Sequence, residues 1–250
     1  MLDLSVLILA RNEEKNMRDC IASVAFASEI IVIDDNSTDN TKQICEELGA
    51  KVYNRSMDGD WGGQQTFAIQ QATNDWIFFI DADERVTPEL AEEIKATVNK
   101  NEKFGYWIKR INHFKKQRVD YGVLRPDYVC RLMPREGSYV EGFVHPTIVH
   151  QYQDKKLTGE MIHYTYNTWE QYFNKFNNYT TLAAEKMYKE GKRCGILKDL
   201  VIRPLFSFVK MYIIQGGFRD GVIGWELSYF HFAYTLAKYV KLRAIQAERG

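Results

Sequence analysis

The sequence has few cysteines and no paired cysteine motif. Cys20, Cys45, Cys130 and Cys194 lie far apart in the chain, and no C-x-x-C spacing occurs. This distribution argues against a structural zinc site and against a disulfide framework, since both need clustered cysteines. We therefore expect reduced thiols and a cytoplasmic location.

Glycine-rich nucleotide motifs are absent as well. Neither G-x-G-x-x-G nor G-x-x-x-x-G-K-[ST] occurs in the 250 residues. The dinucleotide fingerprint and the P-loop are therefore excluded, and any phosphate bound by this chain must be held by other groups.

An excess of charge and a leading signal segment are missing too. The 33 basic and 33 acidic residues cancel, so nothing in the total charge indicates a nucleic-acid partner. With 45% hydrophobic and 26% charged residues, the composition is that of a soluble globular protein. The first apolar run, Leu4–Ala10, has no basic segment before it, so we expect a core strand there and not a signal peptide.

The first eighty residues alternate short apolar segments with amphipathic ones. This alternation predicts an α/β fold with a doubly wound, mostly parallel, Rossmann-like sheet, because parallel strands are joined by right-handed helical crossovers. One expected helix runs from an N-cap at Ser37 to Leu48 and is stopped by Gly49. The expected strands are Leu4–Ala10, Glu29–Asp34, Ala50–Tyr53 and Trp76–Ile80, and the other expected helices are Glu13–Ala25 and Gln64–Ala72.

Polar and acidic residues follow three of these strands. The buried run Trp76–Ile80 ends in Asp81-Ala82-Asp83, and the other two strands end in Arg11-Asn12-Glu13 and Asp34-Asp35-Asn36. The carboxyl ends of strands in such a sheet are where ligands bind, and paired carboxylates suit Mg²⁺ or Mn²⁺ bridging phosphates. A solvated acidic turn after Ile80, or an Asx-type helix cap at Asp34–Ser37, accounts for the same residues without a ligand.

Three segments resemble, in order and spacing, the motifs of the family 2 glycosyltransferases, which have the GT-A fold. They are Val6–Glu14, Ile31–Thr41 and Asp81–Glu84, and the resemblance covers roughly residues 3–100. A narrower likeness, to bacterial lipopolysaccharide inner-core β-glucosyltransferases, rests on Gly63–Ala68, Pro126–Leu132 and Val144–Pro146. The chain departs from that branch at Gln65-Thr66, where the branch has Lys-Asn, and at Pro146, where it has Glu.

The resemblance implies an inverting transfer of a hexose, glucose from UDP-glucose, to a heptose of a lipopolysaccharide core. It implies a divalent metal, Mn²⁺ or Mg²⁺, held by Asp83 and Asp81, to which His145 would add an imidazole ligand. The residues expected to bind the donor are Ala10, Asn12, Glu13, Asp35, Gln64, Asp81 and Asp83. Two alternatives remain. The first is a transferase of the same fold that acts on a polyprenyl phosphate or a capsule glycan, and the second is a module that binds a sugar nucleotide or a glycan without turnover.

Inversion needs a general base near the attacking hydroxyl. Glu141 and Asp127 are the candidates, and Glu141 is preferred because Gly142 beside it permits close approach of a ligand. Asp127 reads equally well as a turn acid paired with Arg131. The basic, aromatic segment Lys109–Arg118 either faces a phosphorylated or acidic acceptor or forms a solvated hairpin.

The last third of the chain is expected to be helical. Thr168–Lys189 is amphipathic, whereas Leu200–Ile214 and Val222–Val240 are rich in aromatic residues but interrupted by charges, which argues against a membrane span. Gly195–Gly250 carries eight basic and four acidic residues. These helices are expected to lie on the membrane surface, where a glycolipid acceptor would be reached from the inner face of the bacterial inner membrane. Packing on the catalytic domain and formation of a homodimer are the alternatives.

The expected organisation is therefore a catalytic domain followed by a helical region. Residues 1–165 form the GT-A domain, with a nucleotide-sugar half at 1–100 and an acceptor half at 101–165. Residues 166–250 form the helical region.

Overall fold

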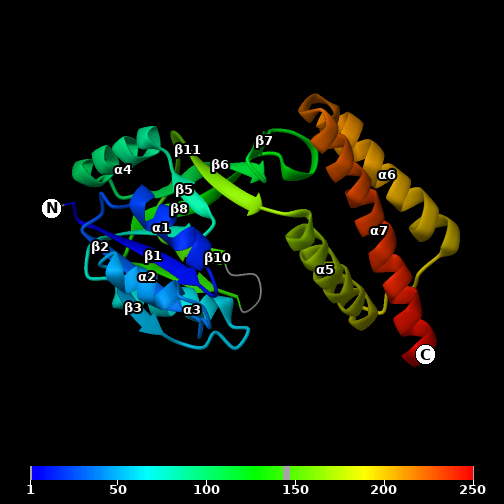
Figure 1. The fold of residues 1–250 in the computed structure, drawn as a ribbon, viewed down its shortest axis with the longest axis horizontal. Coiled ribbons are helices and arrows are strands. Elements are labelled where there is room, and N and C mark those ends of the chain that lie inside the picture. Colours follow the sequence, from blue (N-terminus) through cyan, green and yellow to red (C-terminus); the bar gives the residue numbers. More distant parts are fainter. Residues whose placement is uncertain (1, 143–146, 250) are drawn as a thin grey trace. The chain divides into compact units, whose positions relative to one another are not determined.

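The computed structural model describes residues 2–142 and 147–249, and the chain divides into two compact units (Figure 1). The first unit contains residues 1–110 and 127–163, and the second contains 111–126 and 164–250. The expected organisation placed residues 1–165 in one domain and 166–250 in another. The segment 111–126, which was expected in the catalytic domain, belongs to the second unit.

A parallel half-sheet forms the centre of the first unit. Strand β1 (Leu4–Ala10) pairs in parallel with β2 (Glu29–Asp34) on one side and β4 (Trp76–Asp81) on the other, and β3 (Lys51–Asn54) continues from β2. All four lie where the apolar segments predicted strands. The parallel register brings Ala10 beside Asp34 and Leu9 beside Asp81, so the polar strand ends meet at one edge.

The rest of the sheet is antiparallel, which makes the whole sheet mixed. Strand β8 (Asp127–Pro134) pairs antiparallel with β4, and β6 (Gly105–Phe114) pairs antiparallel with β8. The sheet continues through the long β11 (Asp154–Tyr166) to the short β5 (Glu84–Val86). The remaining strands are β7 (Gln117–Val119), which pairs with β6, and the separate ribbon of β9 (Ser138–Glu141) and β10 (Thr147–His150).

Helices cover both faces of this sheet, because alternate residues of the buried strands point to opposite sides. Helices α1 (Glu14–Ser23), α2 (Thr41–Glu47) and α4 (Pro88–Lys100) pack on the face that carries Val6, Ile8 and Phe78 (Figure 1). Helix α3 (Trp61–Gln71) packs on the opposite face, against side chains that include Leu7 and Phe79. The α/β class and the double winding are thus confirmed.

Helix α2 begins four residues after the expected N-cap at Ser37. The Ser37 hydroxyl instead accepts a hydrogen bond from the backbone N–H of Asn12, and Asp39 accepts one from the N–H of Thr41, the first helical residue. The predicted helix start was wrong because the Ser37 hydroxyl joins the loops after β1 and β2, and Asp39 takes its place as the acceptor at the start of the helix.

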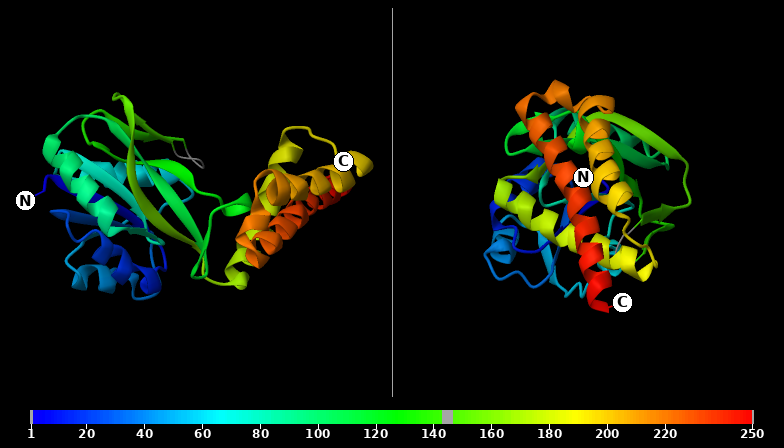
Figure 2. Two further views of the ribbon diagram at one scale, coloured as in Figure 1. Left: turned by 90° about the horizontal axis from the view of Figure 1, so that it is seen from above. Right: turned by 90° about the vertical axis from the view of Figure 1, so that its right-hand side faces the viewer.

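The second unit is helical. Its helices are α5 (Trp169–Lys189), a continuous run of π-helix η2 (Ile196–Ile202), α6 (Arg203–Val209) and π-helix η3 (Lys210–Ile214), and the long α7 (Val222–Arg249), with short 3₁₀ turns η1 (Gly122–Leu124) and η4 (Gly217–Asp220). Helices α5, α6 and α7 lie side by side (Figure 2). Among the described residues, no helix is long and apolar enough to cross a membrane.

The hairpin of β6 and β7 contributes to the core of this unit. Phe114 packs against Trp169 at 4.4 Å between ring centroids, and Tyr172, Ile223 and Leu227 complete the cluster. Aromatic side chains from three separate stretches of the chain thus form part of the core of the second unit.

Candidate active site

A cavity of about 460 Å³ lies at the carboxyl ends of β1, β2 and β4. Six residues expected to bind the donor line it together, although they come from four separate stretches of the chain. They are Ala10, Glu13, Asp35, Gln64, Asp81 and Asp83. Arg11, which was expected at this edge of the sheet without a named role, lines the same cavity, as do Met57, Trp61 and His163, which carried no prediction.

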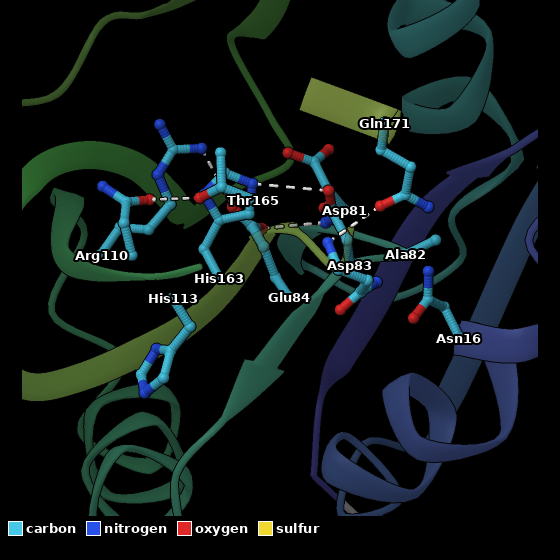
Figure 3. A network of polar contacts seen from close by, with 12 residues as sticks. Asn16, Asp81, Ala82, Asp83, Glu84, Arg110, His113, His163, Thr165 and Gln171 are labelled. Atoms are coloured by element: carbon cyan, nitrogen blue, oxygen red, sulfur yellow. Dashed lines mark hydrogen bonds and ion pairs between the residues drawn. The ribbon is translucent and has the colours of Figure 1, made fainter. Parts of the chain in front are cut away.

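Asp83 and His163 face each other across the cavity. The Nε2 atom of His163 lies 3.5 Å from Oδ2 of Asp83 (Figure 3). His163 is brought there by the antiparallel pairing of β11 with β5, in which it lies opposite Glu84. It stands 80 positions after Asp83 in an ordinary amphipathic strand, so only the strand pairing reveals its place.

Asp81 is held by a buried arginine. The Nη2 atom of Arg131 donates to Oδ2 of Asp81 at 2.5 Å and to both carboxylate oxygens of Glu84 at 2.8 and 2.9 Å. Glu84 is fully buried and Arg131 is 7% exposed. The backbone N–H of Asp81 also donates to Glu84, so two groups fix the strand end that presents Asp81 to the cavity (Figure 3).

The same network continues to Asp127 through Arg110. The guanidinium of Arg110 contacts Glu84 at 3.2 Å and grips Asp127 with two hydrogen bonds of 3.0 and 2.7 Å. The partner of Asp127 is therefore Arg110, its neighbour across the β6–β8 pair, and the expected pairing with Arg131 was wrong. Asp127 and Arg131 lie on the same face of β8 but four residues apart, about 13 Å along an extended strand, whereas Arg110 lies directly opposite Asp127.

Oppositely charged neighbours shift the pKa values of the two buried members of this network, Arg131 and Glu84. Burial alone would lower the pKa of Arg131, but the charges of Asp81 and Glu84 outweigh it and raise that pKa. Burial raises the pKa of Glu84, and Arg131 and Arg110 oppose that rise. Removing either arginine would therefore leave the buried Glu84 with only one of its two counter-charges.

Asp35 is held in place by two hydrogen bonds at the edge of the cavity. Its Oδ2 accepts from Nη1 of Arg11 at 3.0 Å, and its Oδ1 accepts from the backbone N–H of Met57 at 2.9 Å. Asn12 does not line the cavity. Its backbone has a φ of 56°, and its side-chain oxygen accepts from the backbone N–H of Thr38, so it braces the loops after β1 and β2.

Gln64 shapes the cavity while its side-chain groups are engaged elsewhere. The side chain is 1% exposed, accepts from Nη1 of Arg55 at 2.6 Å and donates to the carbonyl of the same residue. Gly62, two residues before Gln64, lies against the backbone of Gly142. A Cβ at Gly62 would lie 2.2 Å from the carbonyl oxygen of Gly142, so only glycine fits there. This close approach joins the start of α3 to the end of β9.

The two candidate bases lie outside the donor cavity. Glu141 is exposed at the end of β9, and its neighbours Val140 and Gly142 line an adjoining cavity of about 430 Å³ with Gly62 and Thr66. The Asp127 side chain is 47% exposed beside Arg110. His145, the expected third metal ligand, lies outside the described residues.

The donor groups of the cavity fit a divalent cation. Two carboxylates, Asp81 and Asp83, and the imidazole of His163 line one space, and such oxygen and nitrogen donors suit Mn²⁺ or Mg²⁺. No group of three or more acidic, histidine or cysteine residues within 2–142 and 147–249 forms a ready metal cage. Mg²⁺ is commonly held by one or two carboxylates together with substrate phosphates, so the carboxylates suffice if the donor completes the set.

A model of glycosyl transferase family 2 matches residues 5–165. The chain is 31% identical over 98% of its length to the lipopolysaccharide core biosynthesis glycosyltransferase LpsC of Rhizobium meliloti, and this match covers 95% of LpsC. It is 28% identical to an uncharacterized glycosyltransferase of Rickettsia typhi, covering 98% of this chain and 87% of that one. The crystal structure of S. aureus TarS residues 1–349 aligns with a TM-score of 0.47 at 14% identity, over 99% of this chain and 92% of that one.

The chain therefore belongs to glycosyl transferase family 2, as its motifs implied.

Proposed function

We propose that this glycosyltransferase is a metal-dependent, inverting hexosyltransferase that moves glucose from UDP-glucose to a heptose of a lipopolysaccharide core. The observation that carries the proposal is the convergence of Asp35, Asp81 and Asp83 on one cavity at the carboxyl edge of the sheet. The likeness to LpsC supports the acceptor class. A glycolipid acceptor would bring the enzyme to the inner face of the bacterial inner membrane.

Each part of the cavity has a role in this reaction. Asp35, held by Arg11, would accept hydrogen bonds from the base or ribose, and Asp81 and Asp83 would hold the metal against the diphosphate. When bound, a divalent cation neutralises the charge that builds on the leaving diphosphate. The exposed indole of Trp61 offers an apolar wall for the nucleotide.

The wild-type protein should be stabilised by UDP together with Mn²⁺. Ligand at about a hundred times its dissociation constant adds roughly 2.7 kcal/mol, which corresponds to a rise in melting temperature on the order of 5 to 10 °C for a chain of this size. Thermal denaturation with UDP alone, Mn²⁺ alone and both together measures this effect. If the pair stabilises no more than UDP alone, the metal assignment is wrong.

A hydrolysis screen with UDP-, GDP- and CMP-sugars then identifies the donor. Turnover with UDP-glucose and with no other nucleotide sugar supports the proposal. Turnover with a different nucleotide sugar alone would show that this sugar, and not UDP-glucose, is the donor. Binding of UDP without turnover of any donor, in the presence of a heptose-containing core acceptor, would favour a non-catalytic binding module.

Glu141→Gln is expected to lower kcat by roughly 10² to 10⁴, the usual contribution of a general base, with little change in the KM for the donor. The matched variant Asp127→Asn should lower kcat less, because Asp127 is committed to Arg110 by two hydrogen bonds. Initial rates over a range of pH measure both. Full activity of Glu141→Gln together with loss of activity in Asp127→Asn would reverse the assignment.

A further inference from the structure

The second unit exposes an unusual concentration of large apolar side chains. Of the 21 large apolar residues that are exposed in the described chain, thirteen lie between Ile196 and Tyr229. They are Ile196, Leu197, Val201, Ile202, Leu205, Phe206, Val209, Ile213, Ile214, Phe218, Val222, Trp225 and Tyr229. Monomeric proteins rarely leave so much apolar surface in one region without a function for it.

Nine of these thirteen residues lie on the continuous helical run η2–α6–η3, and the other four lie on η4 and the start of α7. Leu197, Val201, Leu205, Val209 and Ile213 recur every four residues, which places them on one side of a helix. The buried Asp199 and Pro204 belong to the side that packs within the unit. The exposed side is therefore a separate surface that the fold of this unit does not cover.

The exposed charges on this surface are all basic, whereas Asp220 and Glu226 are only partly exposed. Lys198, Arg203, Lys210 and Arg219 are exposed between the apolar residues. The carboxylate of Asp199 is buried and paired with Arg203 at 2.9 Å, and Asp220 accepts hydrogen bonds from the backbone N–H groups of Asp120 and Tyr121. From Ile196 to Trp225 the structure describes no exposed carboxylate.

We infer that this apolar-basic face, Ile196–Trp225, inserts into the headgroup region of an anionic lipid bilayer. An interfacial helix buries its apolar side about 5 to 10 Å below the headgroups while its lysines and arginines meet the lipid phosphates. The stacked rings of Trp225 and Tyr229, 5.4 Å apart, are of the kind that gathers at this depth. The inference deepens the proposed function and rests on it for the membrane-bound acceptor, but the face itself follows from the second unit alone.

A second copy of the chain is a poorer partner for this surface. A two-fold dimer presents the same patch from both subunits. The basic patch of one subunit would then lie against the same basic patch of the other, with no exposed carboxylate from Ile196 to Trp225 to neutralise it. An anionic lipid surface satisfies the apolar and the charged groups together.

Flotation of the full-length protein with lipid vesicles tests the inference without donor, acceptor or metal. We expect binding to phosphatidylglycerol-containing vesicles at least about ten-fold tighter than to pure phosphatidylcholine, and weakening with salt. Phe206→Glu, which puts a charge on the apolar side, should reduce vesicle binding about ten-fold or more. The double variant Lys198→Gln, Lys210→Gln should reduce it about five-fold for each cation that is removed. Leu182→Glu, an equally exposed apolar position on α5, is the matched control and should bind as the wild type does.

The outcomes separate this inference from the catalytic proposal. Loss of vesicle binding in Phe206→Glu, with unchanged melting temperature and unchanged UDP–Mn²⁺ stabilisation, supports the face whether or not transfer occurs. Equal binding by Phe206→Glu and the wild type overturns it. A dimeric wild type that becomes monomeric in Phe206→Glu, as measured by light scattering, and that binds no vesicles, would also overturn it and assign the face to a second copy.

Discussion

Replacing Asp83 by asparagine is expected to lower kcat/KM on the order of 10³-fold and to abolish stabilisation by UDP and Mn²⁺ together. The substitution keeps the size of the side chain and removes the charge that would hold the cation against the leaving diphosphate. Asp83 lines the cavity beside His163, in the turn between β4 and β5. Its side chain is 27% exposed, so the change should cost little folding stability.

The matched control is Asp19→Asn, which makes the same chemical change at an exposed position of α1. Calorimetric melting with and without UDP and Mn²⁺, followed by initial rates, measures both effects. Retained metal-dependent stabilisation in Asp83→Asn would show that the cation binds elsewhere. If both variants lose the stabilisation by UDP and Mn²⁺ equally, the effect comes from the change in the net charge of the protein and not from the loss of a metal ligand.

The parallel half of the fold and the donor side of the site follow from local pattern. Leu4–Ala10 and Trp76–Asp81 are uninterrupted apolar runs, and a run buried on both faces of a sheet admits few other interpretations. Because parallel strands share one carboxyl edge, the polar residues after each strand had to meet. The sequence therefore predicts that Asp35, Asp81 and Asp83 lie together, and all three line the same cavity.

The remaining features depend on pairings between distant strands, which no local pattern records. His163 reaches the cavity only through the β5–β11 register, and Arg131 reaches Asp81 only through the antiparallel β4–β8 pair. Asn12 was assigned to the donor by resemblance, whereas its side chain in this structure braces Thr38. The amide of Asn12 is a suitable group for binding a donor, but the loops after β1 and β2 decide that this side chain bonds to Thr38 instead.

Replacing Arg131 by methionine is expected to lower the free energy of unfolding by about 3 to 5 kcal/mol, the usual effect of removing one partner of a buried ion pair. The substitution leaves Glu84, which is fully buried, with Arg110 as its remaining cation at 3.2 Å. Arg131→Lys keeps the charge but not the planar fork that reaches Asp81 and Glu84 together, so it should be intermediate. Urea denaturation at pH 7 measures all three proteins.

The pH dependence identifies the cause of this loss. Without Arg131, burial raises the pKa of Glu84 further above its unfolded value, so the native state binds a proton that the unfolded state releases. Stability then falls as pH rises, and the deficit of Arg131→Met should be largest near pH 8 and smaller near pH 5. A second substitution, Glu84→Gln, should flatten this dependence in the double variant because no buried charge remains to be protonated. A deficit that is constant with pH would instead assign the loss to the packing of the arginine side chain.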